Sequence, residues 1–343
     1  MLVLGSTGVM GQRVVRLARE WIPHALVLGG SRHPDPEEPE AVEIDIADED
    51  SLSAGLSGAR VVINCVGPFS YAPEPLVAAC QAAGCDLIDI ADDLDFIRRS
   101  SRAVSDDARI RVVSGCSTVP GLVELLKGRW DGSEEVTELR VTLSMGTRNP
   151  VSGAMLHGLV RPLGRAASQS SGFFWRLEKQ EFAGELKRLS GRYPSIFDEP
   201  RFDAEGDAVR TEFRVGLSSA IGMRALSLAA PLVSLMSDPL LATLCRLGAP
   251  VATVFGKLGS RTGILLLEAI NHRGRVFESL ELRAESAGLD IPASPPVWAA
   301  RAILEDTSHL PFGALSLGQI ITWEQAEAWL SEQGFALSFV RRE

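Results

Sequence analysis

Residues 1–121 alternate between short apolar runs and amphipathic helical patterns, and this alternation constrains the fold more than any other feature of the chain. The apolar runs predict strands at 2–4, 25–28, 42–46, 60–66, 86–90 and 110–113, and helical patterns fall at 12–21, 50–56, 75–83 and 94–105. Strands separated by helices are joined by right-handed crossovers and form a parallel sheet. The sequence therefore predicts an α/β fold with a doubly wound parallel sheet.

A glycine-rich turn joins the first strand to the first helix: Gly5, Ser6, Thr7, Gly8, Val9, Met10 and Gly11. In a Rossmann-type sheet, the first glycine of such a motif permits the tight turn and the second lets the backbone approach a pyrophosphate. The third lets helix and strand pack closely, while the helix N-terminus faces the phosphates. All seven residues are predicted to bind a dinucleotide. A plain tight turn is the alternative.

The end of the second strand selects the cofactor. An NAD site usually has a carboxylate there for the ribose 2′-hydroxyl. This chain has Gly29, Gly30, Ser31 and Arg32 instead, and no carboxylate until Asp35. The hydroxyl of Ser31 and the guanidinium of Arg32 suit a 2′-phosphate, so NADP is predicted in preference to NAD. Alternatively, Arg32 is a solvated loop residue.

Composition and charge exclude several other classes. The net charge of −10 argues against a nucleic-acid partner, which needs a basic surface. The five cysteines are an odd number without short repeated spacing, which favours a reducing cytoplasm. The five histidines are scattered and no Cys-x-x-Cys occurs, so no metal site is predicted. Neither tyrosine is followed by lysine four residues later, which excludes short-chain dehydrogenase chemistry. The N-terminal residues do not predict a signal peptide.

The pattern changes after residue 121. Residues 122–290 predict an α+β domain on a largely antiparallel sheet, because 137–145 alternates and two strand patterns at 262–271 and 275–287 flank a hairpin turn. Residues 291–343 predict a C-terminal segment, mostly helical, that returns to the first domain. We expect the middle domain to carry the substrate site and the dimer interface.

An apolar belt spans residues 225–259 in the middle domain. Its longest uncharged run, 225–237, is shorter than the about 20 residues that a spanning helix needs, so no transmembrane segment is predicted. Prolines at 231, 239 and 250 are expected to cut it into short helices. The belt predicts a homodimer with part of the belt lining the substrate cleft, although a buried core or an apolar ligand would also cover it. Contact with a membrane surface stays open. The aromatic residues Phe173, Phe174 and Trp175 are further candidates for lining this cleft.

Several segments, in order, resemble the saccharopine dehydrogenase-like reductases: the glycine turn 5–11, VINCVGPF at 62–69, LIDIADD at 87–93, SGCSTVPG at 114–121 and the closing helices. Asp92 and Asp93 replace the family's usual Gly-Glu. The resemblance implies a Rossmann domain, a second domain carrying most of the substrate pocket, and hydride transfer with NADP or NAD. The resemblance is good over residues 1–125 and 262–340 and weak over residues 146–260.

Several polar residues are expected at the carboxyl edge of the predicted parallel sheet, where doubly wound folds bind ligands. Asn64, Cys65, Val66, Gly67 and Pro68 are predicted to lie near the nicotinamide ribose, with Asp45 either near the adenine or capping a helix. The candidates for proton transfer are Asp92, Asp93, Tyr71 and Cys116. For each there is a structural alternative: helix capping for the aspartates, a pocket wall for Tyr71 and a small buried residue for Cys116.

These observations predict an NADP-dependent oxidoreductase that transfers hydride to a C=N bond of a small molecule, or oxidises a secondary amine. The first alternative is a trans-acting enoyl reductase on an apolar, carrier-bound or lipid-like substrate. It is favoured by the apolar belt and by the absence of an evident cluster of basic residues for substrate carboxylates. The second alternative is a non-catalytic NADP-sensing or lipid-associated protein.

Overall fold

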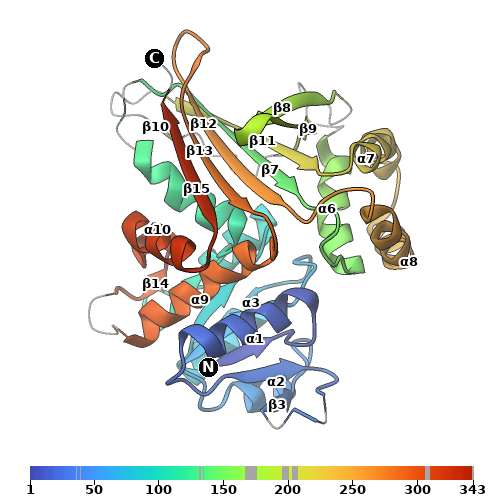
Figure 1. The fold of residues 1–343 in the computed structure, drawn as a ribbon. Helices are drawn as coiled ribbons and strands as arrows, with labels where there is room; N and C mark the ends of the chain where they lie inside the picture. Colours follow the sequence, from blue (N-terminus) through green and yellow to red (C-terminus); the bar gives the residue numbers. More distant parts are fainter. Residues whose placement is uncertain are drawn as a thin grey trace. The chain divides into compact units, whose positions relative to one another are not determined.

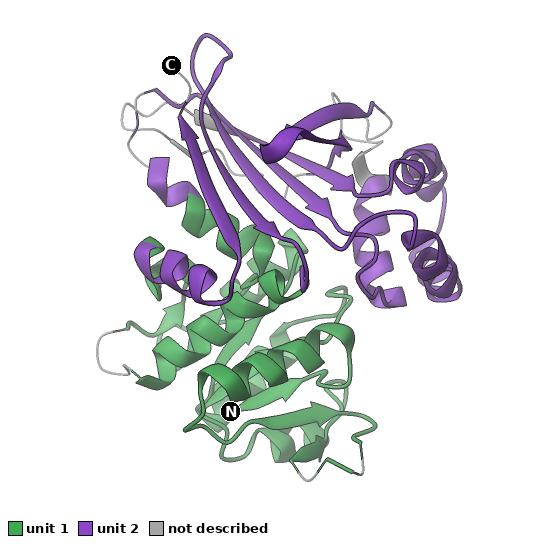
Figure 2. Cartoon of the chain, in the orientation of Figure 1, with its two compact units in different colours: residues 1–126, 289–323 green, residues 127–288, 324–343 purple. Residues whose placement is uncertain are grey.

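The structure is a computed structural model, and it divides the chain into two compact units (Figure 2). Unit 1 comprises residues 1–126 and 289–323, and unit 2 comprises residues 127–288 and 324–343. The residues that the structure describes are 1–35, 37–38, 40–130, 133, 135–166, 176–194, 201–202, 208–305 and 310–341. Phe173, Phe174 and Trp175 lie outside them.

Unit 1 is built on a seven-stranded parallel sheet (Figure 1). Its strand order is β14-β6-β5-β4-β1-β2-β3. The strands are β1 (Leu2–Leu4), β2 (Leu28–Ser31), β3 (Ala41–Glu43), β4 (Val61–Asn64), β5 (Asp86–Asp89), β6 (Arg111–Val113) and β14 (Gly313–Ala314). The predicted Rossmann-type sheet is confirmed.

One predicted strand is displaced. The apolar pattern predicted residues 25–28, but β2 covers 28–31. A Cβ on Gly29 would lie 3.0 Å from the Ser6 hydroxyl, and one on Gly30 would lie 2.8 Å from Ile44. Only glycine fits where β2 is this closely packed. Because glycine has a low strand propensity, the sequence pattern does not predict a strand at these positions.

Helices cover both faces of this sheet. They are α1 (Val9–Trp21), α2 (Glu49–Leu56), α3 (Glu74–Ala83), α4 (Leu94–Arg102) and α9 (Asp290–Glu305), with short turns η1 (Thr118–Leu122) and η4 (Leu317–Gln319) and α5 (Val123–Lys127), which ends in unit 2. Helices α2 and α3 pack leucine, valine and cysteine side chains onto alternate residues of β1, β4, β5 and β6. Helix α9 contacts α1, β4 and β5, and its Trp298 is fully buried. Alternation along the strands accounts for the two packed faces.

Unit 2 is built on a mixed sheet with the order β15-β13-β12-β7-β11-β9-β8, and β10 pairs with β11. The strands are β7 (Glu138–Met145), β8 (Glu178–Phe182), β9 (Leu186–Arg192), β10 (Arg201–Phe202), β11 (Ala208–Leu217), β12 (Gly263–Ile270), β13 (Val276–Ala284) and β15 (Ala336–Arg341). Strands β7 and β11 run parallel, whereas the other described neighbours are antiparallel. The second, largely antiparallel sheet is therefore as predicted.

The remaining elements of unit 2 are the 3-10 turns η2 (Gly128–Trp130) and η3 (Ala183–Glu185) and the helices α6 (Gly153–Ala166), α7 (Ala220–Val233), α8 (Asp238–Gly256) and α10 (Trp323–Glu332), whose first residue belongs to unit 1. The expectation that prolines cut the apolar belt into short helices is wrong for two of them. Pro231 lies inside α7 and Pro250 inside α8, while Pro239 lies in the first turn of α8. A proline in a first turn costs no hydrogen bond, since the N–H it lacks has no intrahelical acceptor.

The C-terminal segment is shared between the units. We expected residues 291–343 to return whole to the first domain. In the structure, residues 289–323 lie in unit 1, but β15 pairs with β13 from Glu278↔Arg341 to Arg283↔Ala336. The last strand therefore completes the sheet of unit 2.

Candidate functional site

The predicted site residues cluster by topology at one edge of the unit 1 sheet. Strand β1 pairs in parallel with β2 and β4, β4 pairs with β5, and β5 pairs with β6. The segments that follow these strands therefore leave the sheet at its carboxyl edge, where open α/β folds bind ligands. They contain the glycine turn, Ser31 and Arg32, residues 65–71, residues 90–93 and the turn around Cys116.

The glycine turn has the geometry of a close-packed loop. Gly5 has a φ of +74°, and a Cβ there would lie 3.1 Å from the carbonyl oxygen of Cys65. A Cβ on Gly11 would lie 2.1 Å from the Gly5 carbonyl oxygen, so helix α1 could not start here with a larger residue. Gly8 is the N-cap and supplies no side-chain cap. The first-turn N–H groups of α1 are therefore available to an anion.

Ser31 and Arg32 have the chemistry that a 2′-phosphate needs. The Ser31 hydroxyl is buried and has no hydrogen-bond partner among the described residues. Arg32 is exposed and has no acidic partner there. The amides of Gly5 and Ser6 donate to the Gly30 carbonyl, which holds the end of β2 beside the glycine turn. An orphaned hydroxyl next to a free guanidinium fits NADP.

Asp45 follows β3 in a local turn. Its Oδ1 accepts a hydrogen bond from the Ala47 amide, and its own amide donates to the Ser51 hydroxyl. The acid that caps α2 is Asp48, which accepts from the Ser51 amide. The capping alternative is therefore wrong for Asp45, and its place near an adenine stays a prediction.

Tyr71 is held by Asn64 at the end of β4. The Val66 amide donates to Asn64 Oδ1 at 3.1 Å, which orients Nδ2 toward the Tyr71 oxygen at 2.8 Å. Because the amide is the donor in this pair, the phenol's own proton is free for another acceptor. Burial raises the pKa of Tyr71 well above its ordinary value, so the phenol is neutral at physiological pH. Its ring packs edge-on against Phe96 at 5.2 Å.

The segment after β4 leaves the sheet beside the glycine turn. The Cys65 amide donates to the Leu4 carbonyl at 2.9 Å, and Val66 contacts the position that a Gly5 side chain would occupy. Gly67 and Pro68 are joined by a cis peptide bond. Burial raises the pKa of the Cys65 thiol, which keeps it protonated. Residues 64–68 are thus adjacent to residues 5–11, and their contacts with a cofactor stay predictions.

Asp89, the last residue of β5, has the most unusual environment at this edge. It is 1% exposed, and burial raises its pKa to about 6, although the amide of Gly115 opposes the rise. Its Oδ1 accepts from the amides of Ala91 and Gly115. Its charge in turn raises the pKa of Tyr71, Cys65 and Cys116. The sequence predicts Asp92 and Asp93 as the proton carriers instead, although an acid that ends an apolar strand is a visible signal.

Asp93 caps a helix, which was the structural alternative to a catalytic role. It is the N-cap of α4, and its side chain accepts from the Phe96 amide at 3.0 Å. Asp92, the preceding residue, is exposed. Phe96 stacks against Tyr71, so Asp93 supports the wall behind that phenol. A catalytic role for either aspartate stays a prediction.

Cys116 lies in the turn after β6. Its side chain is 1% exposed, its amide donates to the Asp89 carbonyl at 2.7 Å, and burial raises the pKa of its thiol. A thiol that is buried and protonated is a poor nucleophile. The turn itself parallels the glycine turn, because a Cβ on Gly121 would lie 2.8 Å from the Gly115 carbonyl. These features favour the structural alternative for Cys116.

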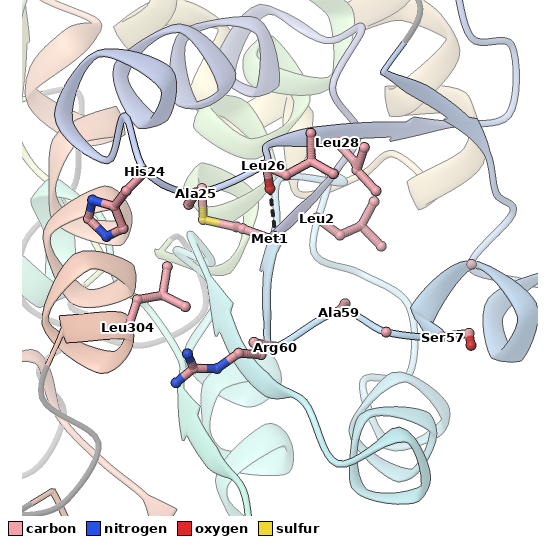
Figure 3. A pocket seen from close by; sticks show the side chains of 12 residues that line it. Met1, Leu2, His24, Ala25, Leu26, Leu28, Ser57, Ala59, Arg60 and Leu304 are labelled. Carbon is pink, nitrogen blue, oxygen red and sulfur yellow. Dashed lines mark hydrogen bonds between the residues drawn. The ribbon is translucent and has the colours of Figure 1, made fainter.

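A hollow of about 330 Å³ lies at the opposite ends of the strands (Figure 3). It is lined mainly by residues before or at the starts of β1, β2 and β4, including Met1, Leu26, Leu28 and Arg60. The Met1 amino group donates to the Leu26 carbonyl at 2.9 Å. The hollow is therefore separate from the carboxyl-edge site. Within the described ranges, no three side chains of His, Cys, Asp or Glu are grouped as metal ligands.

Residues 1–110 match the family model of the saccharopine dehydrogenase NADP binding domain. A protein of Arabidopsis thaliana named "probable mitochondrial saccharopine dehydrogenase-like oxidoreductase" is 26% identical over 181 residues, covering 45% of this chain and 40% of that protein. A trans-acting enoyl reductase of Mycobacterium tuberculosis is 31% identical over 112 residues, covering 30% of this chain and 27% of that protein. The chain thus spans well under half the length of these relatives.

Two solved structures share the fold over nearly the whole chain. Saccharopine dehydrogenase (L-Glu forming) of Saccharomyces cerevisiae aligns with a TM-score of 0.63 and 12% identity, covering 100% of this chain and 99% of that chain. DAP dehydrogenase of C. glutamicum aligns with a TM-score of 0.50 and 15% identity, covering 96% and 97%. The predicted resemblance is confirmed: the chain carries a saccharopine dehydrogenase-type NADP-binding domain at residues 1–110, within a fold like that of saccharopine dehydrogenase.

Proposed function

We propose that the protein is an NADP-dependent oxidoreductase that reduces a C=N bond of a small molecule, or oxidises a secondary amine in reverse. The observation that carries the proposal is the neutral phenol of Tyr71. Asn64 donates a hydrogen bond to it from the end of β4, the strand that pairs with β1 beside the glycine turn. A nucleotide-binding turn and a proton donor at one sheet edge are the two parts that hydride transfer needs. The match of residues 1–110 to an NADP-binding domain supports the first part.

The residues of this edge have separable roles in the proposal. The N–H groups at the start of α1 hold the pyrophosphate, and Ser31 and Arg32 hold the 2′-phosphate. When bound, the reduced cofactor supplies hydride to the substrate carbon. Tyr71 donates a proton to the nitrogen, so that C=N becomes CH–NH and the tyrosinate is reprotonated from solvent. Asp89 accepts hydrogen bonds from the Ala91 and Gly115 amides and so holds the ends of β5 and β6 together, which makes it a positioning residue for this edge.

A second candidate is an enoyl reductase that acts on a carrier-bound or lipid-like substrate. Several mycobacterial relatives named trans-acting enoyl reductase match about 30% of the chain, and this similarity favours the candidate specifically. There the hydride goes to the β-carbon of an enoyl thioester and the proton to its α-carbon. A third candidate is a non-catalytic NADP-sensing or lipid-associated protein, which substrate-dependent oxidation of NADPH would exclude.

Substitution of Tyr71 tests the proposed proton donor. Tyr71→Phe keeps the ring that packs on Phe96 and removes only the hydroxyl, so NADPH affinity should hold while turnover falls by roughly 10²–10⁴-fold. The matched control is Tyr193→Phe, because Tyr193 is the other tyrosine and its hydroxyl donates to the Leu159 carbonyl in unit 2. Turnover of imines and enoyl thioesters would be followed in parallel. Unchanged turnover in Tyr71→Phe would assign the residue to the pocket wall.

Substitution of Arg32 tests the cofactor preference. We expect NADPH to bind at least tenfold more tightly than NADH, which corresponds to about 1.4 kcal/mol. Arg32→Ala should remove most of that preference, whereas Arg102→Ala, at an exposed arginine in the last turn of α4, should not. Calorimetric titration of both cofactors would measure it. Equal affinities in the wild type would contradict the assignment of Ser31 and Arg32.

The homodimer and the cytoplasmic location stay predictions. All five cysteines are free thiols in the structure. Sedimentation at micromolar concentration would test the dimer.

A further inference from the structure

Two helices of unit 2 present their large apolar side chains outward. On α7 and the turn after it, the outward residues recur at helical spacing: Ile221, Leu228, Leu232 and Leu235. On α8 and its end they recur likewise: Leu240, Leu244, Leu247, Val251, Val254, Phe255 and Leu258. These eleven side chains are between 45% and 83% exposed. Soluble monomers rarely expose contiguous apolar patches above a few hundred Å². We call this surface the α7–α8 face.

The inward sides of the same helices are fixed by tight packing. Leu241 and Cys245 of α8 pack with Val160 of α6 and Val233 of α7. Close backbone approaches also hold α8: a Cβ on Gly256 would lie 2.2 Å from the Thr147 carbonyl oxygen. Rotating either helix to bury its leucines would break these contacts. Among the residues that the structure describes, nothing in unit 2 covers the α7–α8 face.

Helix α8 is also the one described helix that is long and apolar enough to cross a membrane. It has 19 residues, and its most apolar window has a mean hydropathy of 1.4 and is 22% buried. Length and composition alone are weak grounds for a span. Arg246 lies near the middle of α8, and the inner stripe of the helix packs on α6 and α7. An interfacial position with only the outer stripe in contact with lipid agrees with both facts.

The charges around this face are segregated. Arg148, Arg224, Arg246 and Lys257 are exposed, and none has an acidic partner in the part of the chain that the structure describes. Arg148 donates to the carbonyl of Lys257, which places it at the end of α8. The acid in this region, Asp238, already pairs with Arg161 at 3.0 Å. A chain with a net charge of −10 therefore has a cationic border along the α7–α8 face.

We infer that the α7–α8 face docks reversibly on an anionic lipid surface. Apolar side chains enter the boundary between headgroups and acyl chains, and the basic side chains contact the anionic headgroups. A second copy of the chain is the other candidate cover. In a twofold dimer the same patch faces itself, so the border cations of the two copies would be brought together without acids to neutralise them. Charge therefore favours lipid over a second copy.

Flotation of the purified full chain with vesicles tests the inference. We expect binding to phosphatidylcholine vesicles that contain phosphatidylglycerol, little binding to pure phosphatidylcholine, and weaker binding as salt is raised. The proposed oxidoreductase activity has no part in this assay, so the two can fail separately. Absence of binding to the anionic vesicles at low salt, or equal binding to both compositions, would overturn the inference.

Paired variants identify the surface. Arg246→Glu with Lys257→Glu should weaken binding by at least about tenfold, whereas Arg273→Glu with Arg275→Glu, on the exposed β12–β13 turn, should not. Leu228→Ser with Leu247→Ser should weaken binding similarly, and Leu26→Ser, at an exposed leucine of unit 1, should not. Unaltered binding in both α7–α8 pairs would overturn the assignment. The inference would also be overturned if the wild-type chain does not bind vesicles and instead forms a dimer that Leu228→Ser with Leu247→Ser dissociates.

Discussion

Helices α1 and α8 place their large apolar residues in opposite ways. In α1 the apolar residues Val14, Val15 and Leu17 are buried, and arginines and a glutamate face outward. In α8 the buried positions include Cys245, Ala249 and Gly256, while leucines and valines face outward. Helix α1 completes a core within its own unit, whereas α8 leaves its largest apolar side chains for a partner outside the chain. The difference separates residues that specify the fold from residues that specify an interaction.

The largest expected contrast comes from truncating one leucine on each helix. Leu17→Ala removes a side chain that is 3% exposed and should lower the free energy of unfolding by about 2–5 kcal/mol. Leu247→Ala removes one that is 69% exposed and should change it by about 0.5 kcal/mol or less. Urea unfolding of both variants measures the contrast. Comparable losses would mean that Leu247 is covered within the monomer.

The pH dependence of stability should differ between a buried carboxylate of unit 1, Asp89, and a half-exposed one of unit 2, Asp238. The folded state raises the pKa of Asp89 from 3.8 to about 6, so it binds a proton more tightly than the unfolded state does. The resulting stability is fully present below about pH 4 and is lost as pH rises through about 6. At 1.36 kcal/mol per pKa unit, the loss is up to about 3 kcal/mol.

Asp89→Asn should therefore gain stability relative to the wild type between pH 4 and pH 7. Asp238→Asn, at the start of α8, weakens the contacts of a half-exposed carboxylate with Arg161 and His157 and should change stability by less than about 1 kcal/mol. Thermal unfolding across that pH range compares the two. If the difference in stability between the wild type and Asp89→Asn does not vary with pH, the raised pKa of Asp89 would be contradicted.

Glycines on the two helices should respond in opposite directions to alanine. At Gly11 the new Cβ would lie 2.1 Å from the Gly5 carbonyl oxygen, so Gly11→Ala should destabilise unit 1 by about 1–3 kcal/mol and weaken NADPH binding. At Gly248 of α8 the nearest atom is 3.9 Å away, so Gly248→Ala should stabilise by about 0.5–1 kcal/mol. Tolerance of alanine at residue 11 would show that α1 does not pack closely on the glycine turn.

The smallest contrast between the units is expected for their helix caps. Asp93 caps α4 in unit 1, and Ser219 caps α7 in unit 2 through the amide of Gly222. Replacing either cap by alanine should cost about 1 kcal/mol. If Asp93 is only a cap, turnover per folded molecule stays unchanged in Asp93→Ala. A loss of turnover without loss of stability would instead give Asp93 the proton-transfer role.

The sequence predicts the parallel sheet well because buried strands such as β4 are continuous apolar runs, and the glycine spacing requires a strand before it and a helix after it. It fails at β2, where Gly29 and Gly30 replace the usual strand formers because neighbouring side chains leave no room for a Cβ. Tertiary packing decides that position, and no local pattern reveals it.

Prediction of the site residues is limited by two ambiguities. An aspartate before a helix has the same sequence signal whether it caps or catalyses, which is why Asp93 could not be resolved. Asp89 ends an apolar strand, which the sequence shows, but its raised pKa arises from burial in the folded chain and no local pattern reveals that property. In the apolar belt, leucines occur around much of each helix, so periodicity alone does not say which stripe is outward.

Transfer of deuterium from specifically labelled NADPH tests the central claim most directly. The purified chain would be incubated with NADPH that carries deuterium at both C4 positions and either a cyclic imine or an enoyl thioester, and the products analysed by mass spectrometry and NMR. The proposal predicts one deuterium on the carbon bonded to nitrogen, and no transfer in the absence of protein. Deuterium on the β-carbon of the thioester alone would replace imine reduction by enoyl reduction, and no transfer to either substrate class, with NADPH bound, would contradict an oxidoreductase.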